Sequence, residues 1–172
     1  MSEHSQPRKD CQMNQTEVYI VTTGQRNFGF NPELKPEGIE QAKLIQMKLL
    51  PRVHRPSLVV VGTGRIHEET YKVLYPSLVA VPIQRSLFCG SADSREPNGT
   101  IALADGSYVA EKDFIGIGDR RFDAWRVVNN LPPNTLLIAW PELMQNLTTV
   151  GEEGRLYVLK PSTERFHEVT SG

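Results

Sequence analysis

The sequence predicts an α/β domain: a three-layer sandwich with a mainly parallel central sheet and helices on both faces. Two β-branched apolar runs, 17–21 and 58–61, are each followed by a glycine-containing turn and then by an amphipathic helical pattern. A third apolar run, 136–139, follows later in the chain. Nearly continuous apolar strands that alternate with helices are typical of parallel sheets joined by right-handed crossovers.

The first strand is preceded by a polar segment and followed by a helix. Residues 1–16 carry Ser, Gln, Asn and mixed charges, so we expect a flexible leader before a single domain over 17–172. The proline-glutamate pair at 36–37 begins the helix and Pro51 ends it. Apolar side chains recur along this helix at three- and four-residue spacing: Ile39, Ala42, Ile45 and Leu49.

The second strand-helix unit repeats this scheme. The run 58–61 is a buried strand, 62–64 (Gly-Thr-Gly) is a tight turn, and 65–74 is a helix. A further short apolar run predicts a strand at 78–81. The pattern therefore predicts three strands and two helices in the first half of the chain.

The second half begins with a long excursion over 83–113, rich in Gly, Ser, Asp and Asn, with a hairpin expected to turn at 104–107. The strand at 136–139 follows, and 155–159 with 165–169 form a closing hairpin with edge character. Between the excursion and the strand, apolar spacing predicts a helix presenting Phe122, Trp125, Val128 and Leu131.

Composition excludes several classes of function. The net charge of −1 is well mixed along the chain, so we expect no nucleic-acid partner and no membrane partner. No apolar run approaches the roughly 20 residues that span a bilayer, and we expect a cytoplasmic protein. Cys11 and Cys89 suit free thiols. Histidines and cysteines lack ligand spacing, so we expect no metal site and no cofactor.

Three turns are the places where the sequence allows chemistry. They are 22–26, 62–65 and 140–142, each directly after an apolar strand. Ligands of open α/β sheets bind at the carboxyl ends of parallel strands, where such turns converge. We therefore expect the three turns to border one site.

The segment Leu34-Lys35-Pro36-Glu37-Gly38, leading into Gln41-Ala42, resembles the opening of the histidine phosphatase (phosphoglycerate mutase-like) superfamily. The order of elements supports this resemblance over about 17–169. It implies a histidine phosphatase-like fold. In that family a first-turn histidine attacks a phosphoryl group, arginines clamp the phosphate, and a second histidine ends a later strand.

The residues that carry this chemistry in the family are absent here. The resemblance places the first arginine on Thr22, the nucleophilic histidine on Thr23 and the second histidine on Trp140. Gly24 keeps the pattern. A threonine hydroxyl is a poor nucleophile without a base, so the resemblance implies a degenerate member that has lost covalent phosphoryl transfer.

A ligand site can survive that loss. Arg26, and Arg65 one residue before the family's other arginine position, are candidates for restoring a phosphate clamp, because a guanidinium pairs bidentately with phosphate. Solvated surface arginine is the alternative for both, and threonines that simply end a buried strand are the alternative for the first turn. The full set of expected ligand contacts is Thr22, Thr23, Gly24, Gln25, Arg26, Gly64, Arg65 and Trp140.

These residues support three hypotheses of function. The first is a catalytically inactive domain that binds a phosphorylated or anionic small molecule in a regulatory role. The second is a divergent phosphomonoesterase in which His67 is the general base, although a histidine in a first helical turn is more often only a polar residue. The third is a protein-interaction scaffold that contacts a protein partner through the long loop or the leader.

Overall fold

The computed structural model describes residues 17–29, 31–77, 80–86, 100–102, 108–110, 124–148 and 151–170. The leader expected over 1–16 and the hairpin turn expected at 104–107 lie outside these residues. Within the described part of the chain, no helix is long and apolar enough to cross a membrane.

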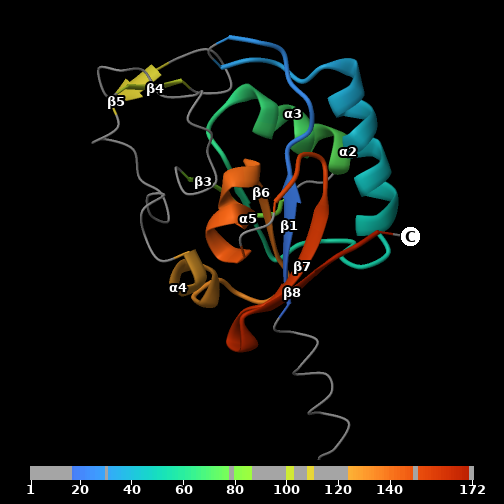
Figure 1. The fold of residues 1–172 in the computed structure, drawn as a ribbon, viewed down its shortest axis with the longest axis vertical. Coiled ribbons are helices and arrows are strands. Elements are labelled where there is room, and N and C mark those ends of the chain that lie inside the picture. The colour runs from blue at the N-terminus through green and yellow to red at the C-terminus, as the bar shows by residue number, and fades with distance from the viewer. Residues whose placement is uncertain are drawn as a thin grey trace, which may run out of the picture.

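The central sheet has six strands in the order β3-β2-β6-β1-β7-β8 (Figure 1). The first four in that order pair in parallel, whereas β7 pairs antiparallel with β1, and β8 antiparallel with β7. The strands are β1 (Val18–Thr22), β2 (Leu58–Val61), β3 (Ile83–Arg85), β6 (Thr135–Ala139), β7 (Leu156–Lys160) and β8 (Arg165–Glu168).

Helices cover both faces of this sheet, because its strands are apolar on both sides. In β1, Tyr19 and Val21 face one core and Val18 and Ile20 face the other. The first core includes residues of α2 (Pro36–Leu49) and α3 (Arg65–Leu74), and the second includes residues of α4 (Ala124–Asn129) and α5 (Pro141–Thr148). The three-layer α/β fold with a mainly parallel sheet is therefore confirmed (Figure 1).

The third strand of the parallel part lies later than the sequence predicts. Residues 80–81 belong to no strand, and β3 occupies Ile83–Arg85 instead. Ala80 has a φ of 63°, a left-handed conformation that does not fit an extended strand. Residues 78–79 lie outside the described chain. The prediction of a strand at 78–81 is therefore wrong for residues 80–81.

Two further differences concern the last part of the chain. The closing hairpin is present, but of its two strands only β8 is at an edge of the sheet, because β7 lies between β1 and β8. Four of the five residues of β7 are buried, as befits an interior strand. The helix α5 is not predicted from the sequence.

In the middle of the chain, the predicted hairpin is confirmed by the antiparallel pairing of β4 (Thr100–Ala102) with β5 (Tyr108–Ala110).

Candidate functional site

The turns after β1, β2 and β6 meet at one edge of the sheet. The N–H of Thr23, just after β1, donates to the carbonyl of Ala139 at the end of β6 over 3.0 Å. The N–H of Gly62, just after β2, donates to the carbonyl of Ile138 over 3.2 Å. The predicted convergence of the three turns is thus present in the structure.

Thr22 fastens the end of β1 to the loop that precedes β7. Its hydroxyl donates to the carbonyl of Glu152 over 2.6 Å and accepts the N–H of Arg155 over 2.9 Å. The side chain is wholly buried. In this structure Thr22 therefore has the structural role that was the alternative to ligand contact.

Replacing Thr22 with valine keeps the shape and removes both hydrogen bonds. We expect a loss of about 1–2 kcal/mol in the free energy of unfolding, because the Glu152 carbonyl and the Arg155 N–H lose their partner. Urea denaturation measures this loss. Thr163→Val, at an exposed hydroxyl, is the control and is expected to change stability by less than about 0.5 kcal/mol. Equal stability of the two variants would contradict the assignment.

Two other hydroxyls at this edge are buried and find no partner among the described residues. Thr23, after β1, and Thr63, after β2, are at most 1% exposed. Within the described part of the chain, their Oγ1 atoms make no hydrogen bond. Buried polar atoms without a protein partner are uncommon and are often satisfied by water or an ion.

The first turn is held by the start of α2. The Oε1 atom of Gln41 accepts the N–H of Gln25 over 2.9 Å, and a side chain at Gly24 would collide with that same oxygen. A side chain at Gly38 would likewise collide with the Gln25 carbonyl. Gly38 is therefore needed because a side chain there would meet backbone, whereas at Gly24 the nearest atom is the end of the Gln41 side chain, with the Gly38 backbone at 3.0–3.1 Å.

Arg26 links three parts of the chain. Its guanidinium carbon lies 4.0 Å from the ring centroid of Trp140, which follows β6. Its Nη1 atom lies 3.8 Å from Oε2 of Glu153, in the loop before β7. A guanidinium stacked on an indole is stabilised by a cation-π interaction. The structure thus brings together two of the predicted residues, Arg26 and Trp140.

Arg65 has different partners. Its Nη1 atom lies 3.7 Å from Oε2 of Glu33, and its backbone N–H donates to Oδ1 of Asn31 over 3.0 Å. Gly64, the residue before it, is buried at the start of α3. The contacts of Arg65 therefore belong to the loop 25–35, and no described contact joins it to Arg26 in a clamp.

His67 packs beneath the second turn. Its side chain is wholly buried, and a Cβ placed on Gly62 would lie 2.5–2.7 Å from three atoms of its imidazole ring. A general base must reach the proton that it removes. The catalytic role considered for His67 stays a prediction, and its position in the structure is that of a packed side chain.

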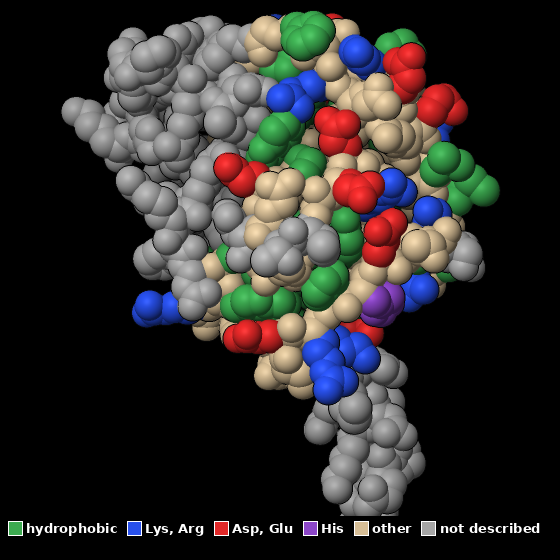
Figure 2. Space-filling view, in the orientation of Figure 1, with side chains coloured by type: hydrophobic (Ala, Val, Ile, Leu, Met, Phe, Trp, Pro, Cys, Tyr) green, Lys and Arg blue, Asp and Glu red, His purple; other side chains and the backbone are tan. Residues whose placement is uncertain are grey.

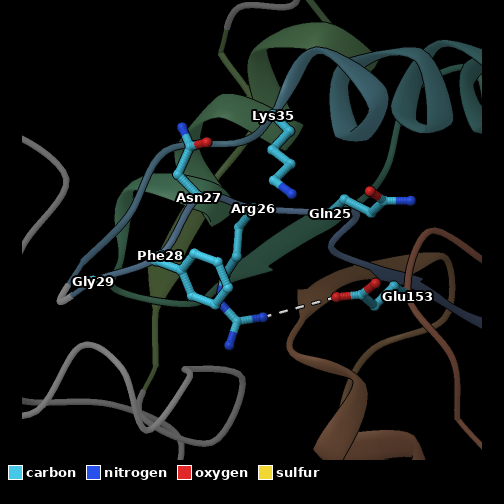
Figure 3. A pocket seen from close by; sticks show the side chains of 7 residues that line it. All are labelled: Gln25, Arg26, Asn27, Phe28, Gly29, Lys35 and Glu153. Carbon is cyan, nitrogen blue, oxygen red and sulfur yellow. Dashed lines mark ion pairs between the residues drawn. The ribbon is translucent and has the colours of Figure 1, made fainter.

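A hollow of about 370 Å³ lies beside Arg26 (Figure 3). Lys35 carries a second positive charge into its lining and has no ion-pair partner within the described residues. Glu153 carries the negative charge. The lining residues are Gln25, Arg26, Asn27, Phe28, Gly29, Lys35 and Glu153.

A second hollow, of about 460 Å³, also has Glu153 in its lining. Trp140 and Gln41 line it together with the pair formed by Glu152 and Arg155, whose Oε1 and Nη2 atoms are 2.8 Å apart. The hydrogen bond from the guanidinium to Glu152 raises the pKa of Arg155 above its usual value. Because these charges neutralise each other, the second hollow attracts an anion less than the first.

Several residues at this edge were not predicted. No sequence pattern marks Lys35, Phe28 or Glu153 as a site residue. Arg85, at the end of β3, also lies at this edge and pairs with Glu68 over 2.8 Å. Knowing that β7 pairs with β1 would have indicated Glu153, since that pairing places the loop before β7 beside the first turn.

The surface in Figure 2 shows Lys and Arg interspersed with Asp and Glu, without a large area of one sign. No group of three or more His, Cys, Asp or Glu residues in the described chain could hold a metal ion. Positive charge suited to an anion is present locally, at Arg26 and Lys35 in the lining of the first hollow.

No family model and no curated protein matches this sequence, but solved structures match its fold. The alpha-ribazole phosphatase from Shigella flexneri matches with a TM-score of 0.55 at 13% identity, covering 89% of this chain and 94% of its own. The protein histidine phosphatase SixA, complexed with tungstate, matches with a TM-score of 0.52 at 13% identity. The match covers 89% of this chain and 94% of the SixA chain.

A third solved structure is the phosphoserine phosphatase from Entamoeba histolytica in complex with 3-phosphoglyceric acid. It matches with a TM-score of 0.51 at 10% identity, covering 90% of this chain and 95% of its own. At these identities the likeness concerns the fold alone. The fold of this chain is therefore histidine phosphatase-like.

Proposed function

We propose that this domain binds a phosphorylated or otherwise anionic small molecule beside Arg26 without hydrolysing it, and that it serves as a regulatory binding module. The observation that carries the proposal is the guanidinium of Arg26, stacked 4.0 Å from the ring centroid of Trp140 at the rim of a hollow that also contains Lys35.

The geometry of Arg26 supports anion binding. The stacked indole restrains a side chain that would otherwise lose much rotamer freedom on binding. The side chain of Arg26 is 22% exposed and that of Glu153 is 43% exposed. Their ion pair is long and partly solvated, so it contributes little, and an oxyanion with bidentate geometry can replace it. Lys35 adds a second positive charge.

The hydroxyl and imidazole groups at this edge support binding without hydrolysis. The Thr22 hydroxyl already bonds the backbone before β7. The Thr23 hydroxyl is buried and needs a base to become a nucleophile. His67, which the alternative of a divergent phosphomonoesterase requires, has a wholly buried ring packed against Gly62. Anion binding itself is supported by two of the solved structures with this fold, which contain the oxyanions tungstate and 3-phosphoglyceric acid.

Phosphorus NMR of the full chain mixed with methyl phosphate and phenyl phosphate tests the proposal, because each spectrum reports binding and hydrolysis together. We expect shifted or broadened ester signals with no growth of free phosphate. Phosphate release that is lost in His67→Ala would overturn the proposal in favour of a divergent phosphatase. Unchanged spectra would overturn it in favour of a protein-interaction scaffold.

Replacing Glu153 with glutamine is expected to strengthen anion binding about threefold. The substitution removes a negative charge that competes for the Arg26 guanidinium across 3.8 Å. The dissociation constant for phenyl phosphate measures the change. Glu164→Gln, at an exposed carboxylate on the turn before β8, is the control for net charge. Weaker binding in Glu153→Gln would mean that this carboxylate contacts the ligand favourably.

A further inference from the structure

We infer that the anionic ligand carries an aromatic ring, which stacks on Phe28 while the anion contacts Arg26 and Lys35. This inference rests on the proposed function and names the class of ligand, an aryl phosphate or a comparable aromatic anion. The observation behind it is a phenylalanine that is 100% exposed yet lines the same hollow as the two positive charges.

Phe28 is presented by a loop that folds back on itself. Arg26 and Leu34 form an antiparallel bridge across this loop. Next to it, the N–H of Asn27 donates to the carbonyl of Glu33 over 2.9 Å, and the N–H of Lys35 donates to the carbonyl of Gln25 over 2.9 Å. The two limbs of the loop are therefore held together on both sides of the bridge.

The loop is also fastened to α3. The N–H of Leu34 donates to Oε1 of Glu69 over 2.8 Å, and Oδ1 of Asn31 accepts the first N–H of the helix, that of Arg65. Gly29, next to Phe28, has a φ of 114°, which glycine adopts readily and other residues do not. These contacts hold the two limbs of the loop that carries Phe28.

The ring and the charge lie on one side of the loop. Figure 3 shows the side chains of Phe28 and Arg26 extending to the same side, whereas Asn27 extends to the opposite side. This alternation is that of extended backbone, in which residues two apart share a face. Figure 3 also shows Lys35 extending toward the hollow from the other limb. A molecule that contacts Arg26 and Lys35 therefore has an aromatic face beside it.

A ligand with an aromatic ring gains from this arrangement and a purely polar anion does not. Covering Phe28 removes an apolar face from water, and offset or edge-to-face packing of two rings adds to that gain. The hollow of about 370 Å³ is at the small end of the range for ligand sites. It suits one ring with one anionic group rather than a large conjugate.

The test compares two esters that share the phosphate and differ in the ring. Calorimetric titration of the full chain with phenyl phosphate and with methyl phosphate, at a pH where both are dianions, gives two dissociation constants. We expect phenyl phosphate to bind about tenfold more tightly. Phe28→Ala is expected to remove that preference by weakening the binding of phenyl phosphate about tenfold. Met47→Ala, at another exposed apolar side chain, is the control and is expected to change neither constant.

The outcomes separate this inference from the function on which it rests. Equal binding of both esters by the wild-type chain, or a preference for phenyl phosphate that survives Phe28→Ala, would overturn the aromatic inference and leave anion binding intact. Binding of neither ester would overturn both. Because Phe28 is fully exposed, its replacement by alanine leaves the fold undisturbed, so loss of the preference reports the ligand contact itself.

Discussion

Replacing Arg26 with glutamine is expected to weaken the binding of phenyl phosphate and methyl phosphate about tenfold to a hundredfold. In the proposed function the guanidinium pairs with the oxyanion, and charge-assisted hydrogen bonds of this kind are among the strongest in proteins. It is also held in place, 4.0 Å from the ring centroid of Trp140. Calorimetric titration of the variant and the wild-type chain gives the ratio of dissociation constants.

Two matched variants make this result specific. Arg26→Lys keeps the charge but loses the planar fork, so we expect an affinity between those of the wild type and Arg26→Gln. Arg165→Gln removes the same charge at an exposed position on β8, and we expect it to leave the affinity unchanged within about twofold. Equal weakening by Arg26→Gln and Arg165→Gln would indicate that only net charge matters, and would contradict the assigned site.

Replacing Gly62 with alanine is expected to lower the free energy of unfolding by about 3 kcal/mol. The added methyl group would lie 2.5–2.7 Å from three atoms of the His67 ring, well inside contact distance. The ring has little room to withdraw because it is wholly buried, and overpacking of a filled interior costs energy of this order. Urea denaturation of the variant and the wild-type chain measures the difference.

A double-mutant cycle shows whether the His67 ring causes the loss of stability in Gly62→Ala. In the His67→Ala background the methyl group meets no imidazole, so we expect Gly62→Ala to cost less than about 1 kcal/mol there. The same cost in both backgrounds would mean that the backbone of the turn, rather than the packed histidine, forbids a side chain. The cycle therefore separates a packing role for His67 from a backbone requirement at Gly62.

The parallel core of the fold could be predicted because its signal is local. The strands β1, β2 and β6 are continuous apolar runs, and a strand that must be apolar on both faces leaves that signature whatever its neighbours are. β3 was misplaced because it is a three-residue edge strand containing Gln84 and Arg85, which resemble loop residues. The more apolar run before it contains Ala80, whose φ of 63° excludes a strand.

The convergence of the three turns could be predicted, but not which side chains line the hollow beside the first of them. Convergence of the turns at the carboxyl edge follows from parallel strand order alone. The pairing of Arg26 with Trp140 joins residues far apart in sequence, and no periodicity reports it. Phe28 and Lys35 reach the site only because the loop 25–35 folds back on itself. Sequence patterns describe strands and helices, whereas loop conformation depends on contacts such as that between Leu34 and Glu69.

The measurement that tests the account most directly is a crystal structure of the full chain soaked with tungstate. The heavy oxyanion stands in for a phosphate group, and the strong anomalous scattering of tungsten identifies its position in the electron density. We expect tungstate in the hollow, with oxygens in hydrogen-bonding range of the Arg26 guanidinium and the Lys35 amine. A hollow that stays empty at saturating tungstate, or an anion bound instead at the Thr23 and Thr63 hydroxyls, would contradict the proposed site.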